Sequence, residues 1–228
     1  SNYISKKINT SHHHKEIRLS KMQEICGNFL SRINEPLSDS SLLSFFHLCE
    51  FAKTKVKVAL GGEGADELFT GYDTFKAIKY LNMMRSLKLN KINPLFDFLS
   101  SLFSNNYNYM SYKFKLKRFA RFSSNSLLMS HCQWLSPLTI KEINELFEEE
   151  VSKEELYSEA INLWNQNNHL NYIDKSSIFY IKLFLQDQIL VKTDRVSMMH
   201  SLEVRNPFLD YDLINCVRKI PHNLKLNG

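Results

Sequence analysis

Hydrophobic positions recur at helical spacing in the first quarter of the chain. The pattern predicts an amphipathic helix over 22–33 that ends before Pro36, because the residue preceding a proline is pushed out of helical geometry. A second helix is predicted over 41–54. The apolar positions are Met22, Ile25, Cys26, Phe29, Leu30 and Ile33 in the first helix, and Leu42, Phe45, Phe46, Cys49 and Ala52 in the second.

The period then changes to that of a strand. Residues 56–60 are a short β-branched run that ends at Gly61-Gly62, and a helix is predicted to begin near Ala65. Helix, strand, loop and helix in this order indicate an α/β fold with parallel strands. Upstream, 3–8 and 14–19 leave room for at most one further short strand, so we expect a helix-rich fold with a small parallel sheet.

The later part of the chain carries further local signals. Thr139–Glu142 and Ser152–Glu155 match the capping-box pattern, which marks two helix starts. A long helix is predicted around Ile178, Ile181, Phe184 and Leu185, whereas 90–121 is irregular. The basic and aromatic stretch 112–122 could contact nucleic acid, but we interpret it as a solvated helix or loop, because the net charge of +5 is mild.

Composition narrows the class of protein. With 228 residues and 43% hydrophobic content, the chain can bury a substantial core. The four cysteines are far apart and form no CxxC pair, which is typical of free thiols in a reducing compartment and not of a disulfide frame or zinc site. No apolar run reaches membrane-spanning length and no signal peptide is visible, so we expect a cytoplasmic protein without a membrane partner.

The loop after the strand carries the clearest chemistry. Gly61, Gly62 and Gly64 let the backbone approach a ligand, and the following helix directs its N–H groups toward the same point. Three carboxylates, Glu63, Asp66 and Glu67, surround this turn. Because carboxylates repel phosphate unless a cation intervenes, the pattern favours nucleotide phosphates with magnesium. The alternative, that the glycines only form a tight turn and the acids only complement the helix dipole, stays open at this point.

A second constellation lies between 187 and 210. Its charged residues alternate with apolar ones, so we expect them to be partly buried, paired and suited to a site wall. For Glu203 and Arg205 a structural ion pair is the favoured interpretation. The charged set is Asp187, Lys192, Asp194, Arg195, Glu203, Arg205 and Asp210.

Together these segments resemble the synthetase domain of glutamine-dependent asparagine synthetases. The family's Ser-Gly-Glu/Asp-Gly-Ser/Ala-Asp-Glu-Leu/Val-Phe-Gly-Gly-Tyr loop is matched over 61–72, and its Asp-Arg-x-Ser-Met…Glu-x-Arg-x-Pro-Phe-Leu-Asp segment over 194–210. A looser match covers 35–41. The resemblance spans nearly the whole chain but is weak from 90 to 175.

The resemblance implies a partial Rossmann-like PP-loop ATP pyrophosphatase fold of the adenine nucleotide alpha hydrolase type. It also implies a reaction in which aspartate attacks the α-phosphate of ATP, giving β-aspartyl-AMP and pyrophosphate, after which ammonia displaces AMP. The ammonia would come from glutamine, through a glutaminase domain normally in the same chain. A homodimer is the expected assembly of the full-length protein.

Residue roles follow by position from the same resemblance. Gly61, Gly62 and Gly64 would line ATP, while Asp66 and Glu67 would face magnesium and pyrophosphate. Glu63 would also contact the nucleotide and act as the base that takes a proton from ammonia. Lys225 is a candidate for the catalytic lysine, although the family pattern places that residue beyond 228. Asp194, Arg195, Glu203, Arg205 and Asp210 would form a supporting network.

Departures from the family pattern set further expectations. Gly61 replaces a serine, which removes a hydroxyl but keeps a backbone donor, and Thr70 replaces a glycine in what we expect to be helix. Neither a Ser-Gly-Gly-x-Asp-Ser loop nor an N-terminal cysteine nucleophile is present. We therefore expect residues 1–228 to be an incomplete synthetase domain that binds ATP weakly alone.

Two other functions remain open from the sequence. Relatives on this scaffold activate other carboxylates, forming lactams or amidating peptides or glycans, and the acyl-substrate pocket is not legible in these residues. A truncated, non-catalytic pseudo-synthetase that serves as a partner subunit is the second alternative.

Overall fold

The computed structural model describes residues 2–33, 35, 37, 39, 41–87, 115, 119, 126–147 and 150–226. The chain forms two compact units, of which the first comprises 1–62 with 188–207 and the second comprises 63–187 with 208–228. Both units are therefore built from segments far apart in sequence. The basic and aromatic stretch 112–122 lies outside the described residues, except for Lys115 and Phe119.

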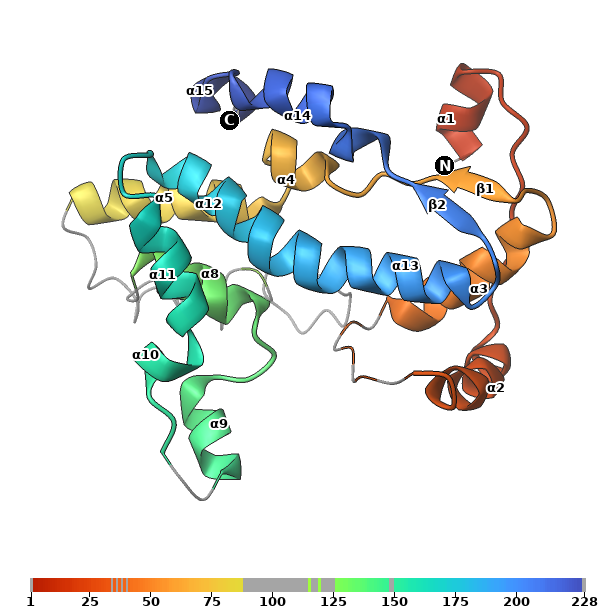
Figure 1. The fold of residues 1–228 in the computed structure, drawn as a ribbon, viewed down its shortest axis with the longest axis horizontal. Helices are drawn as coiled ribbons and strands as arrows, with labels where there is room; N and C mark the ends of the chain where they lie inside the picture. The colour runs from red at the N-terminus through yellow and green to blue at the C-terminus, as the bar shows by residue number, and fades with distance from the viewer. Residues whose placement is uncertain are drawn as a thin grey trace, which may run out of the picture. The chain divides into compact units, whose positions relative to one another are not determined.

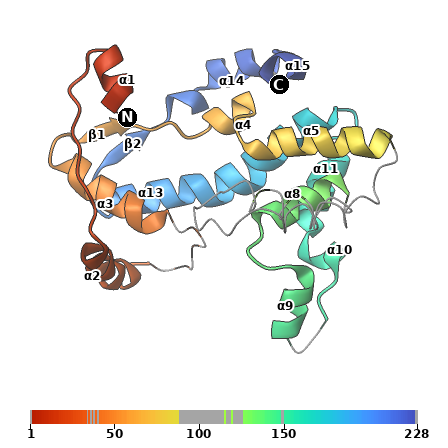
Figure 2. The same cartoon turned by 180° about the vertical axis from the view of Figure 1, so that it is seen from behind.

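The first unit is a two-stranded parallel sheet with helices. Val58 pairs with Glu203 and Leu60 with Arg205, so the carboxyl ends of both strands lie at the same edge. Figure 1 and Figure 2 both show the strands side by side. The elements are α1 (Asn2–Lys7), α2 (Leu19–Leu30), α3 (Leu42–Lys53), β1 (Val58–Leu60), α13 (Val191–Met198) and β2 (Glu203–Arg205).

One face of this sheet packs on an apolar core. Ala59 and Val204 face a cluster built by α2, α3 and α13, in which the Phe29 and Phe46 rings meet edge to face at 5.5 Å. Burying each such ring contributes about 2 kcal/mol. Val58 and Leu60 point to the opposite face, where both are exposed. Helices α2, α3 and α13 thus cover the face that carries Ala59 and Val204.

The second unit is helical. Its core joins α5, α8, α11 and α12 around Phe75, Ile78, Ile173 and Tyr180, all of which are at most 1% exposed. The elements are α4 (Ala65–Phe69), α5 (Asp73–Ser86), α8 (Leu127–Leu135), α9 (Ile140–Leu146), α10 (Lys153–Leu156), α11 (Ser158–Gln166), α12 (Tyr172–Phe179), η2 (Pro207–Leu209, whose Pro207 belongs to the first unit), α14 (Tyr211–Arg218) and α15 (His222–Lys225).

A continuous helical segment leads from the second unit into the first. Helix α12 continues into η1 (Tyr180–Leu190), which has π-helical hydrogen bonding, and then into α13. The helix predicted around 178–185 is confirmed. Its π-helical hydrogen bonding was not predicted from the sequence.

Other predicted elements are confirmed with shifted limits. Helix α2 begins and ends three residues earlier than predicted. Its last residue is Leu30, so the helix ends at Ser31 and not directly before Pro36. Strand β1 is two residues shorter than predicted. The two upstream segments were expected to hold at most one further strand, and neither forms one: 3–8 is helix α1 through Lys7, and 14–18 has no regular structure before α2 begins.

The two capping patterns differ in the structure. Thr139 and Glu142 form a reciprocal capping box at the start of α9, as predicted. At α10, the Ser152 side chain accepts from the Glu155 amide at 3.1 Å, which is half of that motif. Among the described residues, no helix is both long and apolar enough to cross a bilayer.

Candidate functional site

The glycine loop joins the carboxyl end of β1 to the start of α4. Gly64 caps α4 with φ of 93°, a left-handed conformation that favours glycine. A Cβ at this position would also lie 2.4 Å from the Leu209 side chain. Two independent constraints therefore explain Gly64, and both are structural.

The other two loop glycines differ in what surrounds them. The Gly61 amide donates to the Arg205 carbonyl at 2.8 Å, and a Cβ there would lie 2.3 Å from Asn206 Oδ1. The backbone donor expected to be available at Gly61 is thus engaged in the sheet. Gly62 is exposed, and a Cβ there would meet nothing within 4 Å. Of the three glycines, Gly62 has the backbone most accessible to a ligand.

The three carboxylates of the loop are not equivalent. Glu67 is 1% exposed, and the Tyr72 hydroxyl donates to its Oε1 at 2.6 Å. Burial raises the pKa of Glu67, the nearby Asp66 and Glu63 charges raise it further, and the Tyr72 hydrogen bond partly offsets them. Asp66 is exposed and Glu63 is half-buried. Glu67 therefore faces inward, and Asp66 is the carboxylate open to solvent.

This arrangement fits a magnesium ion that is bound mainly by its phosphate ligands. Among the described residues, no group of three or more His, Cys, Asp or Glu side chains is placed to hold a metal ion alone. Magnesium usually takes one or two carboxylates and completes its shell with phosphate oxygens and water. Asp66 fits such a role. Glu67 is less suited to it, because its side chain is 1% exposed and already accepts from Tyr72.

Tyr72 is a residue of this region that sequence reasoning missed. Besides holding Glu67, its ring packs against Tyr180 at 5.3 Å between ring centres. The Tyr180 hydroxyl donates to Thr74 Oγ1 at 2.7 Å, and its oxygen lies 3.3 Å from Nδ1 of the buried His131. Burial lowers the pKa of His131 to about 3. The only available sequence signal was that Tyr72 ends the 61–72 motif.

Asp66 also explains a neighbouring glycine. A Cβ on Gly71 would lie 2.0 Å from Asp66 Oδ1, so any side chain at Gly71 would displace the carboxylate. The Gly71 amide donates to the Asp66 carbonyl at 2.9 Å. The absence of a side chain at Gly71 therefore leaves the space that the exposed carboxylate occupies.

Two basic residues of 187–210 are paired as expected. The Lys192 amine is largely buried and lies 2.7 Å from Asp39 Oδ2, and it also donates to the Ser41 hydroxyl at 3.0 Å. Burial raises the pKa of Asp39, but hydrogen bonds from Lys192 and Ser41 outweigh that effect and lower it overall. Arg195 lies 3.0 Å from Glu35. These pairs fasten α13 to the residues preceding α3.

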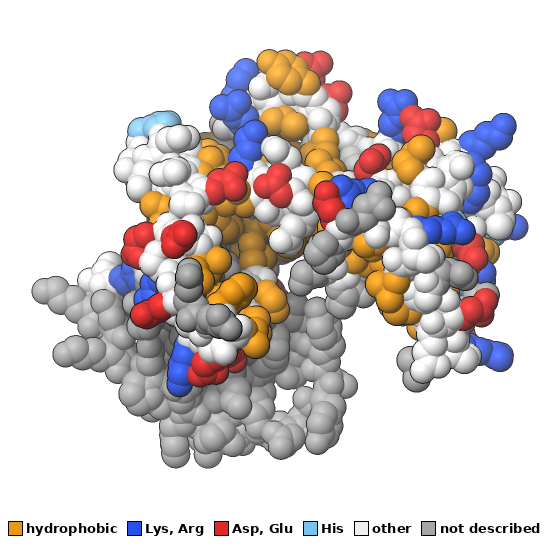
Figure 3. All heavy atoms as spheres, turned by 60° about the horizontal axis from the view of Figure 1, so that its bottom comes forward, with side chains coloured by type: hydrophobic (Ala, Val, Ile, Leu, Met, Phe, Trp, Pro, Cys, Tyr) orange, Lys and Arg blue, Asp and Glu red, His pale blue; other side chains and the backbone are white. Residues whose placement is uncertain are grey.

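The remaining members of the predicted network are exposed. The Arg205 guanidinium donates to Glu203 Oε1 at 2.6 Å, so the favoured ion pair exists, but at the surface rather than partly buried. Asp210 caps α14 by accepting from the Asp212 and Leu213 amides, and Asp194 is exposed on α13. On the face in Figure 3, acidic and basic side chains lie interspersed among apolar ones.

Lys225 lies at the end of α15 and is half-buried. Burial lowers the pKa of its amine, and the Asp174 carboxylate acts in the opposite direction. The Thr70 hydroxyl donates to the Lys225 carbonyl at 3.0 Å. Thr70 was expected within a helix; instead it ends α4 with φ of 56°.

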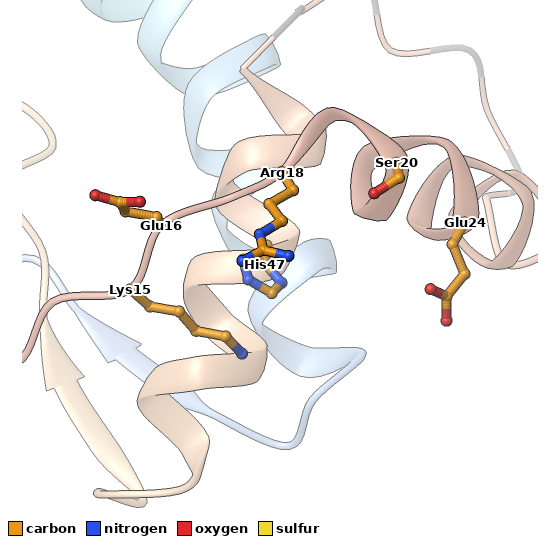
Figure 4. A pocket seen from close by; sticks show the side chains of 6 residues that line it. All are labelled: Lys15, Glu16, Arg18, Ser20, Glu24 and His47. Atoms are coloured by element: carbon orange, nitrogen blue, oxygen red, sulfur yellow. The ribbon is translucent and has the colours of Figure 1, made fainter.

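A pocket of about 300 Å³ in the first unit contains none of the predicted site residues. Figure 4 shows Lys15 and Arg18 reaching toward His47, with Glu16 directed away. Glu50 lies 2.9 Å from His47 Nδ1, although not at a hydrogen-bond angle, and 4.0 Å from Lys15. Mixed charges therefore line a surface hollow. The lining residues are Lys15, Glu16, Arg18, Ser20, Glu24 and His47.

The small parallel sheet, the glycine loop and the surrounding helices are compatible with an α/β fold. The family model described as asparagine synthase matches residues 1–228, and the chain belongs to this family. No solved structure matches the chain significantly.

Curated relatives carry the same family name. Asparagine synthetase [glutamine-hydrolyzing] 1 of Bacillus subtilis is 30% identical over 203 residues, covering 84% of this chain and 29% of the relative. A putative asparagine synthetase of Mycobacterium tuberculosis is 26% identical over 205 residues, covering 85% and 28%. A putative asparagine synthetase of Methanocaldococcus jannaschii is 27% identical over 199 residues, covering 83% and 35%. The chain thus spans about a third or less of the length of these relatives.

Proposed function

We propose that this chain contributes the magnesium and pyrophosphate side of a site for ATP-dependent amide formation. In the reaction, aspartate and ATP form β-aspartyl-AMP and pyrophosphate, and ammonia from glutamine then gives asparagine and AMP. Membership of the asparagine synthase family supports the reaction class. Aspartate as the acyl substrate, magnesium as the metal and a cytoplasmic location belong to the proposal.

The exposed carboxylate of Asp66 is the observation that carries this proposal. It lies on the first turn of α4 beside Gly71, three residues after Glu63 and four after the exposed backbone of Gly62. A magnesium ion on Asp66 would supply positive charge that stabilises the pyrophosphate leaving group. The Gly62 backbone would approach the phosphates, and Glu63 would hold the proton taken from ammonia.

Glu67 has a different role in this proposal from the one expected by resemblance. Its carboxylate accepts from Tyr72 and is 1% exposed, so it would act through its charge and would not contact the metal. Lys225 would bring its amine toward the reacting groups. Because burial lowers the pKa of Lys225, its amine is more readily neutral than that of an exposed lysine.

The test is a titration of Mn²⁺ with ATP against the isotopically labelled chain, followed by NMR, because Mn²⁺ is a paramagnetic substitute for magnesium. Signals of Gly62, Glu63 and Asp66 should broaden first. Asp66→Asn should weaken this effect about tenfold or more, as loss of one charged ligand costs at least 1.4 kcal/mol. The matched control is Asp212→Asn on α14, another exposed first-turn aspartate. Equal broadening in both variants would exclude Asp66 as a metal ligand.

A further inference from the structure

Thr70 adopts a backbone conformation that disfavours its own side chain. It ends α4 with φ of 56° and ψ of 40°, in the left-handed region, and is 5% exposed. A β-branched residue rarely takes this conformation, because its Cβ substituents crowd the backbone. In the family motif to which 61–72 corresponds, a glycine stands here. Threonine is therefore strained at this position, whereas the glycine of the family motif would not be.

The hydroxyl of Thr70 makes a contact that glycine could not. It donates to the main-chain carbonyl of Lys225 at 3.0 Å, across 155 positions of sequence. Both residues belong to the second unit. The carbonyl lies in the last turn of α15, where no intrahelical donor is available to it. Thr70 thus satisfies a helix end that would otherwise need water.

Helix α15 has only four residues, so its position depends on such contacts. Its first residue, His222, has Nδ1 3.0 Å from Asn171 Nδ2, and Leu226, just after its end, is buried in the core of the second unit. The Thr70 hydrogen bond ties this helix to the residue that ends α4. Local strain persists where surrounding contacts over-determine it, and this contact supplies such a reason.

We propose that Thr70 is a positioning residue that fastens α15, and with it the Lys225 side chain, to the turn that ends α4. The role of Lys225 in catalysis rests on the proposed function. The hydrogen bond between Thr70 and the Lys225 carbonyl does not depend on a bound nucleotide. Because the hydroxyl holds the Lys225 carbonyl rather than its amine, Thr70 acts through the placement of the helix. Loss of the hydroxyl should release α15 and increase solvation of the amine.

Three substitutions at Thr70 separate the hydroxyl from the backbone strain. Thr70→Ser keeps the hydroxyl, Thr70→Val keeps the shape without it, and Thr70→Gly removes both hydroxyl and strain. The matched control is Thr54→Val in the first unit, where a threonine hydroxyl also donates to a main-chain carbonyl, that of Phe51, at 2.7 Å. Hydrogen exchange of the Leu226 amide, which donates to the His222 carbonyl, reports the order of α15.

Thr70→Val and Thr70→Gly should exchange the Leu226 amide about fivefold to tenfold faster, as expected for loss of one hydrogen bond. Thr70→Ser and Thr54→Val should match the native chain. The rate at which an acetylating reagent modifies Lys225, measured against pH by mass spectrometry, should reach half its maximum at a higher pH in the two hydroxyl-free variants. Burial lowers the pKa of this amine, so solvation should raise it.

Two results would overturn the proposal. One is unchanged Leu226 exchange and Lys225 acetylation in Thr70→Gly, the variant expected to fold even where Thr70→Val does not. The other is faster exchange throughout the second unit in both hydroxyl-free variants, which would assign Thr70 to general stability. A negative outcome for Asp66 with Mn²⁺ and ATP would leave these measurements interpretable, so the two proposals fail separately.

Discussion

The buried carboxylate of Glu67 should make the second unit sensitive to pH. Its pKa in the folded chain is raised, first by burial and then by Asp66 and Glu63. Between the unfolded value, near 4.5, and the higher folded value, the folded state binds more protons than the unfolded state. The free energy of unfolding therefore falls as pH rises through this window, and the charged carboxylate is a cost at neutral pH.

Glu67→Gln should remove that cost while still accepting from Tyr72. We expect the variant to be more stable than the native chain at pH 8, and the difference to vanish below pH 4.5, where glutamate is protonated in both states. Urea unfolding followed by tryptophan fluorescence measures this, since Trp134 and Trp164 both belong to the second unit. Glu154→Gln, at an exposed position of α10, is the control. Equal stability of Glu67→Gln and native chain at pH 8 would contradict the expectation.

At the scale of elements, Asp210 lies in a motif that suggested a site residue, but in the structure it caps a helix. It belongs to the family segment 194–210, which suggested a supporting network around the nucleotide. In the structure it accepts from the Asp212 and Leu213 amides at 3.0 and 3.1 Å and so caps α14. Asparagine caps helices as well as aspartate does, whereas alanine does not.

Asp210→Ala should lower the free energy of unfolding by about 1 kcal/mol, and Asp210→Asn by a few tenths at most. Urea unfolding gives the stability, and hydrogen exchange of the Asp212 and Leu213 amides locates the loss in α14. Neither variant should alter Mn²⁺–ATP broadening at Gly62. A loss of nucleotide binding in Asp210→Asn, with stability retained, would instead assign the carboxylate to the site.

At the scale of the whole molecule, the chain spans less than a third of the length of the Bacillus subtilis and Mycobacterium tuberculosis relatives. Its candidate loop offers one exposed carboxylate, and among the described residues no set of groups holds a metal alone. Val58 and Leu60 leave an apolar face of the sheet exposed. Because the loop offers one exposed carboxylate, we expect it to bind a nucleotide weakly by itself.

Calorimetric titration of the 228-residue chain with Mg²⁺–ATP should give a dissociation constant of about 1 mM or weaker, since one carboxylate and a few backbone donors supply about 4 kcal/mol. Aspartate-dependent release of pyrophosphate should be undetectable. The control is a full-length relative assayed under the same conditions. Turnover by the chain comparable to that relative would show that residues 1–228 contain a complete site.

Local signals predicted the elements that local physics controls. Apolar spacing located α2 and α3, the glycine pair located the end of β1, and Thr139 with Glu142 marked the start of α9. Strand β2 was not predicted, because three residues with charged ends resemble a strand only once paired with β1. The segment 3–8 was considered as a possible strand, because a run of six residues is too short for its apolar spacing to distinguish a helix from a strand.

The sequence by itself determined the family of this chain and which loop carries glycines and carboxylates, because short motifs retain residue types and order. Tertiary structure alone decided how those residues differ. It buries Glu67 against Tyr72 and leaves Asp66 exposed, although they are adjacent on one helix. It commits the Gly61 amide to β2 and joins Thr70 to Lys225. Burial and hydrogen bonding between distant segments set these differences, and neither is written in the spacing of residues along the chain.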